Sequence, residues 1–136
     1  MQSPLAFALL AGALTVAMPA VAELTPGQME AATRVYVGDS DCEFKQVINL
    51  KAVAGKPGHF ELTHKKAKYL LVPQETTTGA VRLEDTKAGI VWIQIPAKSM
   101  MLNTKLGQRV VDNCMGAEQR AEASQGVQAT NSFGLK

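Results

Sequence analysis

The sequence predicts an all-β fold, a small antiparallel β-barrel of about seven to eight strands with one disulfide. Three observations predict it. Between residues 41 and 115, short apolar runs alternate with turn-forming residues at close spacing. The most strand-like of these runs, residues 90–95, contains Val91, Trp92 and Ile93, residue types that favour strands. The two cysteines, Cys42 and Cys114, stand near the two ends of this segment, so a disulfide between them would join the first strand to the last.

Residues 1–22 are typical of a secretory signal peptide. Their apolar run, Leu5 to Met18, is too short to cross a bilayer, which makes a membrane anchor the less favoured alternative. The segment ends in Ala20-Val21-Ala22, the small-x-small pattern that signal peptidase cleaves, although no basic residue precedes the apolar run. In a bacterium such a leader predicts a periplasmic protein without a membrane-spanning segment.

The expected export also bears on the chemical state of the two cysteines. In an oxidising compartment an isolated pair is most simply a disulfide. A redox or metal-binding pair is disfavoured, because the chain has no Cys-x-x-Cys and no His beside either Cys42 or Cys114.

Residues 23–40 form a lead-in to the domain. Thr25 followed by Pro26 predicts a helix start, with Thr25 as the cap and Pro26 at the first helical position. The short helix would run over Met29 to Ala32.

The barrel domain is expected over residues 41–115. Cys42, Phe44, Ile48 and Leu50 share one parity, so they predict one face of a first strand. Further strands are expected over residues 60–63, 69–72, 81–84, 90–95, 99–102 and 110–114. Pro73 would end one of them.

Two further expectations concern Trp92 and the C-terminal segment. The chain's one tryptophan, Trp92, lies in the most strand-like run and is expected inside the barrel. Residues 116–136 are rich in Ala, Gln, Ser, Gly and Asn, which predicts a flexible C-terminal tail.

Composition excludes several classes of function. The formal net charge of +2 is mixed along the chain, so no nucleic-acid partner is expected. No phosphate-binding loop or nucleophile motif is present, and His59 and His64 would lie on opposite faces of a strand. We therefore expect a protein that is not an enzyme and that needs neither a metal nor another cofactor.

One basic cluster, residues 64–68, reads His-Lys-Lys-Ala-Lys. It could meet an anionic surface such as lipid headgroups or cell-wall polymer. A solvated turn is the favoured interpretation.

The order of segments carries a resemblance to a known family. A Cys-headed strand is followed by Tyr69-Leu70, a hydroxyl-rich loop before Gly79, a Trp-containing strand, and a final strand ending at Cys114. This order, over about residues 36–114, resembles the bacterial inhibitors of C-type lysozyme, the MliC/PliC family. The resemblance implies a small antiparallel barrel that blocks the lysozyme cleft with its loops.

The family's two inhibitory motifs are altered in this chain. The first, Ser-Gly-x-x-Tyr, corresponds to residues 78–82, where Thr78 keeps the hydroxyl, Gly79 keeps the turn and Arg82 replaces the tyrosine. The second motif places a lysine just before a glycine. In this chain the matching connector is residues 95–99, and Pro96 stands near the glycine position. The nearest lysine, Lys98, is displaced by about three residues and is followed by Ser99. The resemblance implies that these loops contact the catalytic carboxyl groups of lysozyme.

The predicted function is therefore a periplasmic inhibitor whose partner is a C-type lysozyme. C-type lysozymes are generally basic, so a local acidic rim formed by Glu75, Glu84 and Asp85 would have to offset the chain's positive charge. Two alternatives remain: a small-ligand or lipid-binding barrel of the bacterial envelope, and a structural envelope protein. An exposed barrel edge would allow a homodimer, although nothing in the sequence requires one.

Overall fold

The structure is a computed structural model that describes residues 11–16 and 23–133, with the side chains of the last helix described as far as Gly126. The predicted signal peptide, residues 1–22, lies outside the described residues except for 11–16, which form neither helix nor strand.

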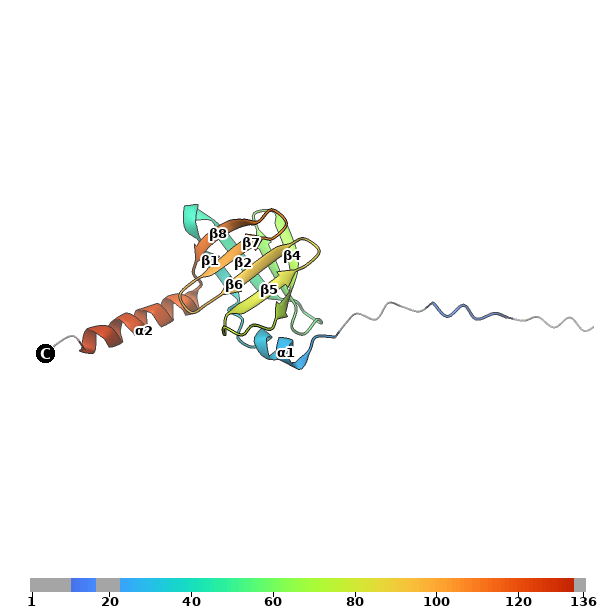
Figure 1. The fold of residues 1–136 in the computed structure, drawn as a ribbon, viewed down its shortest axis with the longest axis horizontal. Helices are drawn as coiled ribbons and strands as arrows, with labels where there is room; N and C mark the ends of the chain where they lie inside the picture. Colours follow the sequence, from blue (N-terminus) through green and yellow to red (C-terminus); the bar gives the residue numbers. More distant parts are fainter. Residues whose placement is uncertain (1–10, 17–22, 134–136) are drawn as a thin grey trace, which may run out of the picture.

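The described chain folds as a single antiparallel meander, which confirms the predicted fold class (Figure 1). Eight strands pair in sequence order, each antiparallel to the next. They are β1 (Gly38–Asp41), β2 (Val47–Ala52), β3 (Phe60–His64), β4 (Ala67–Gln74), β5 (Val81–Asp85), β6 (Ile90–Gln94), β7 (Ser99–Asn103) and β8 (Gln108–Cys114).

The sheet curls until β8 meets β1, which gives a nearly closed barrel. Asp41 and Met115 exchange two backbone hydrogen bonds of 3.0 and 2.9 Å across this seam. Cys42, which follows Asp41, and Cys114, which precedes Met115, form the predicted disulfide. The seam between first and last strand is therefore held by a short bridge and one covalent bond.

The barrel interior is filled by side chains. Alternate strand residues point inward, as the two-residue period of a strand requires. Trp92 is fully buried, as predicted, and it belongs to a core that also contains Ile48, Leu50, Phe60, Leu62, Leu71, Leu83, Met101 and Val111.

A short helix, α1 (Pro26–Ala32), lies across one end of the barrel (Figure 1). Its start confirms the sequence prediction, because Thr25 and Gln28 form a reciprocal capping box. The Gln28 amide nitrogen also donates to the carbonyl of Pro73, 2.9 Å away in β4. Ala31 is buried, so the predicted lead-in is an integral part of the fold.

The first part of the barrel differs from the sequence prediction. Strand β1 begins at Gly38, inside the expected lead-in of residues 23–40. Cys42 and Phe44 do not share a strand with Ile48, because a 3₁₀ turn, η1 (Glu43–Lys45), separates β1 from β2. The disulfide holds Cys42 at the seam, so the chain must reverse immediately after it to pair β2 with β1.

Pro73 does not end β4, which continues to Gln74. The first part of β4 pairs with β3 and the last part with β5. In an antiparallel strand the N–H and C=O of one residue point to the same side. The Pro73 carbonyl accepts from Gln28 of α1, so the position where Pro73 lacks an N–H also faces α1. A proline is tolerated there because no neighbouring strand needs its hydrogen.

The expected flexible tail over residues 116–136 also differs from the structure. Residues Ala117–Phe133 form a helix, α2, which extends away from the barrel (Figure 1), and residues 134–136 lie outside the described part. The tail's Ala, Glu and Gln residues are good helix formers, and Gln119 is buried at the barrel end. Low apolar content indicates a segment that forms no core, but it does not distinguish a polar helix from a coil.

Candidate functional site

Alternate turns of a meander lie at the same end of the barrel. The β4–β5 loop (residues 75–80) and the β6–β7 turn (residues 95–98) therefore share one end with α1, the segment leading into β1, and the start of α2. We call this the α1 end. The two loops that the sequence analysis expects to contact lysozyme both lie at this end.

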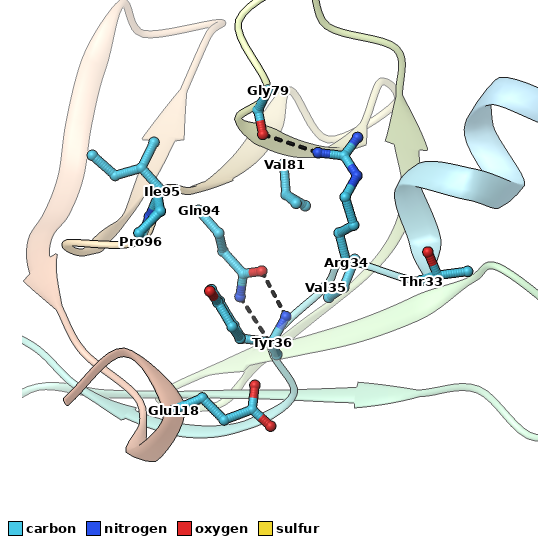
Figure 2. Close-up of a pocket in the computed structure, with 10 residues that line it drawn as sticks. All are labelled: Thr33, Arg34, Val35, Tyr36, Gly79, Val81, Gln94, Ile95, Pro96 and Glu118. Carbon is cyan, nitrogen blue, oxygen red and sulfur yellow. Dashed lines mark hydrogen bonds between the residues drawn. The ribbon is translucent and has the colours of Figure 1, made fainter. Parts of the chain in front are cut away.

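A pocket of about 490 Å³ opens at the α1 end (Figure 2). Four segments that are far apart in the sequence line it: residues 33–36, the region of Gly79 and Val81, residues 94–96, and Glu118 at the start of α2. The pocket therefore depends on the folded barrel together with both terminal segments.

Arg34 forms one wall of this pocket. Its Nη1 atom donates to the carbonyl of Gly79 at 2.9 Å, which ties the lead-in to the β4–β5 loop (Figure 2). Its Nε atom lies 3.2 Å from a carboxylate oxygen of Glu30, one helical turn earlier. The Arg34 side chain is 40 % exposed, so its guanidinium is positioned by the fold yet accessible from solvent.

Gln94 forms the floor. Its amide oxygen accepts from the backbone N–H of Tyr36 at 2.9 Å, and its amide nitrogen donates to the Tyr36 carbonyl at 2.7 Å. The Gln94 side chain is buried at 2 % exposure, and this two-way bond satisfies its polar atoms while fixing the segment that precedes β1.

Tyr36 and α2 meet at the pocket's other side. The Tyr36 hydroxyl donates to a Glu122 carboxylate oxygen at 2.8 Å. This hydrogen bond raises the pKa of Tyr36 above its usual value, with smaller contributions from burial and from the negative charges of Glu122 and Glu118. Tyr36 therefore remains a neutral donor throughout the neutral pH range.

The β6–β7 turn is fixed by α2. The side-chain nitrogen of Gln119 donates to the Ile95 carbonyl at 2.8 Å and to the Ser99 hydroxyl at 3.0 Å. The side-chain oxygen of Gln119 accepts from the backbone of Gly116 at 3.0 Å. The first turn of α2 is thus part of the framework that shapes the α1 end.

The structure brings only part of the predicted site together. Thr78 and Gly79 lie on the exposed β4–β5 loop, and Gly79 has a φ of +78°, which favours glycine. A neighbouring hydroxyl, that of Thr76, donates to the Ala80 carbonyl at 2.7 Å and stabilises the loop. Arg82 lies on the barrel wall in β5 and pairs with Glu84 at 3.4 Å.

Lys98 and Ser99 are engaged within the protein. The Lys98 ammonium lies 3.1 Å from Asp112, whose side chain is only 8 % exposed and also pairs with Arg109. The N–H of Asn113 holds the pKa of Asp112 below its usual range, and Lys98 and Arg109 act in the same direction, against the effect of burial. Ser99 is fully buried under Gln119, so it cannot contact a partner while α2 is in place.

No known protein family, curated protein or solved structure matches this chain. Two further findings concern the residues that the structure describes. None of their helices is long and apolar enough to cross a membrane. No group of three or more His, Cys, Asp or Glu side chains among them is placed to hold a metal ion.

Sequence reasoning did not identify Arg34, Tyr36, Gln94 or Glu118. Arg34 and Tyr36 follow the expected lead-in helix and belong to no motif, whereas Gln94 stands in a strand whose apolar neighbours indicate only a core. The one available signal was Gln94 itself, a polar residue at the end of the most apolar strand, since a buried amide needs partners.

Proposed function

We propose that this protein is a periplasmic inhibitor of C-type lysozyme that covers the enzyme's cleft with the α1 end of its barrel. The observation that carries this proposal is the meeting of the β4–β5 loop and the β6–β7 turn around one pocket, with the guanidinium of Arg34 fixed between the lead-in and Gly79. A closed barrel with a disulfide at its seam is also the scaffold expected of such an inhibitor.

The chemistry matches the target. Lysozyme cleaves with two carboxyl groups that flank the scissile bond, so an inhibitor needs hydrogen-bond donors aimed at them. A guanidinium carries five N–H donors, and the contacts of Arg34 with Gly79 and Glu30 leave donors on its terminal nitrogens for a carboxylate. Thr78, on the exposed loop, would supply the hydroxyl. In this proposal Arg34 replaces Lys98, because Lys98 is paired with the buried carboxylate of Asp112, whereas Arg34 and its partner Glu30 are both exposed.

Charge at the α1 end supports the encounter with a basic enzyme. Glu75, Glu118 and Glu122 are all exposed there. Of the acidic residues expected to form a rim, Glu84 pairs with Arg82 and Asp85 lies at the opposite end of β5, so the two glutamates of α2 take their place. These glutamates would attract a basic partner and offset the exposed Arg34 and Arg120 at the same end.

The location follows from the same proposal. The disulfide fits an oxidising compartment, and the predicted leader over residues 1–22 would direct the chain to the periplasm. A lysozyme that crosses the outer membrane would meet the inhibitor there.

The test is a titration of a C-type lysozyme that is clearing a suspension of bacterial cell walls. Purified protein should abolish clearing at a stoichiometric ratio. Arg34→Gln combined with Thr78→Ala should weaken inhibition by at least about tenfold, because a charge-assisted hydrogen bond is lost. Arg82→Gln, the control on the barrel wall, should leave inhibition unchanged. Failure of a large excess to slow several C-type lysozymes would overturn the proposal.

A second candidate function is favoured by the pocket itself. Its volume of about 490 Å³ falls within the range of small-molecule sites, and the barrel interior is filled by its own side chains. A small polar ligand would therefore bind at the α1 end. Native mass spectrometry of the purified protein would reveal such a ligand as a discrete added mass that Gln94→Ala abolishes.

A further inference from the structure

Two turns at the end of the barrel opposite α1 are held together. One is η1 with Gln46, between β1 and β2; the other is the β3–β4 turn of residues 65–66. A ring nitrogen of His64 and the side-chain oxygen of Gln46 are 2.7 Å apart, and His64 and Ile48 are partners in the ladder between β2 and β3. In Figure 1 the turquoise turn of η1 stands on the opposite side of the barrel from α1.

Backbone strain is concentrated in these two turns. Four non-glycine residues in the described part of the chain have a positive φ, and three of them, Phe44, Lys45 and Lys65, belong to these turns with φ near 55°. A bulky residue such as phenylalanine rarely adopts this conformation. Such strain persists where the surrounding structure enforces it and is common at binding sites.

The strained backbone presents an exposed aromatic side chain with unpaired lysines. Phe44 is 84 % exposed, and Lys45, Lys65 and Lys66 on the same two turns are exposed as well. The ion pairs between described residues include none of these three lysines. We call Phe44, Lys45, Lys65 and Lys66 the basic tip.

Nearby carboxylates are occupied elsewhere. Lys51 and Lys68, on the barrel wall, both lie within 4 Å of Glu61, at 3.3 and 3.7 Å. Glu43, which precedes Phe44, accepts from the backbone N–H of Asp112 at 2.9 Å and so is turned towards β8. The positive charge of the basic tip therefore remains available to an external anion.

We propose that the basic tip binds the surface of an anionic phospholipid bilayer, with Phe44 inserted between the headgroups. Lysine is a compact, mobile charge that suits the diffuse negative charge of a lipid surface better than the fixed carboxylates of a protein. A single projecting aromatic ring can enter the interfacial region of a bilayer, but it offers no broad apolar face to a folded partner.

A bilayer bound at the basic tip would leave the pocket accessible. The basic tip and the pocket lie at opposite ends of the meander, so a bilayer bound at one leaves the other facing solvent. The proposal does not depend on lysozyme inhibition, and either can fail alone.

The test is co-sedimentation of the purified protein with vesicles. The protein should bind vesicles of phosphatidylglycerol and phosphatidylcholine, remain unbound with phosphatidylcholine alone, and dissociate as salt is raised. Since each lysine near an anionic surface contributes about fivefold in affinity, Lys65→Gln with Lys66→Gln should lower partitioning roughly 25-fold. Phe44→Ser should lower it by about tenfold.

The control variant carries the same charge change elsewhere. Lys51→Gln with Lys56→Gln lies in β2 and the β2–β3 turn, and it should reduce partitioning far less than the pair at the basic tip. Because all the altered side chains are on the surface, an unchanged melting temperature verifies folding. Equal losses in both lysine pairs, no effect of Phe44→Ser, or the absence of vesicle binding at low salt would each overturn the proposal.

Discussion

Removal of the disulfide tests how the barrel is closed. Cys42 and Cys114 are separated by 72 residues, and in the chain-entropy model a crosslink over that distance stabilises the fold by about 4 kcal/mol. Other contacts also cross the seam: two backbone hydrogen bonds between Asp41 and Met115, each with a net contribution of about 1 kcal/mol, the hydrogen bond from the Asp112 N–H to Glu43, and the exposed ion pair of Arg120 with Asp41. The covalent bond should therefore be the largest single contribution to the stability of the seam.

The expected effect is large compared with the stability of a small domain, about 5–15 kcal/mol. Cys42→Ala with Cys114→Ala should remain folded near room temperature but lose about 4 kcal/mol and roughly 15–25 °C in melting temperature. Urea unfolding can be followed by the fluorescence of Trp92, which is buried in the core. The linear extrapolation to water gives the free energy of unfolding.

Reduced wild-type protein is the matched control, because it breaks the bond without removing any side chain. Its unfolding curve should coincide with that of the double variant. A loss below about 1 kcal/mol in both would refute the reasoning, since the 72-residue loop would then have little effect on the unfolded chain.

Three further predictions concern stability and can be measured by the same urea titration. Leu83→Ala, at a fully buried position, should cost about 2–5 kcal/mol through the cavity that it leaves. The N–H of Asn113 holds the pKa of Asp112 below its usual range, so ionised Asp112 should stabilise the fold above about pH 4. This contribution should be lost as the pH falls through the folded-state pKa. Asp112→Asn should therefore make the loss of stability in acid less steep. Gln119→Ala should cost about 1–3 kcal/mol, because the buried hydroxyl of Ser99 and the turn beside it lose their donor, whereas a mobile tail would tolerate the change.

Much of the fold could be predicted because it depends on local patterns. Alternating residues such as Phe60 and Leu62 define a strand face, and Thr25 followed by Pro26 defines a helix start. The disulfide followed from the cysteine count and the predicted export of the chain. Each of these signals lies within a few residues or in the composition as a whole.

The parts that could not be predicted depend on distant partners. Strand β1 has the sequence Gly-Asp-Ser-Asp, which has no strand propensity, and it forms because β2 and the seam provide partners for its backbone. Pro73 stays within a strand only because α1 covers the side on which it lacks a hydrogen.

The candidate site shows the same limit. The two loops lie at one end of the barrel, but the partner of Lys98 is Asp112, which is 14 residues away in sequence and belongs to no motif. Arg34 reaches the β4–β5 loop across 45 residues of chain, so no local pattern could indicate its contact with Gly79. Side-chain pairing at the site is decided by the closed barrel rather than by any one segment.

The polar sequence of β1 has a consequence for the chain before its thiols are oxidised. Every other strand pairing joins neighbours in sequence and can form early, whereas closure of the seam joins the two ends of the sheet. Until then β1 is a free edge, and such edges invite pairing with other chains. An edge of only four residues that carries the exposed carboxylates of Asp39 and Asp41 offers little to a second copy. The short, acidic β1 thus limits edge-to-edge pairing at this side of the sheet until the disulfide forms.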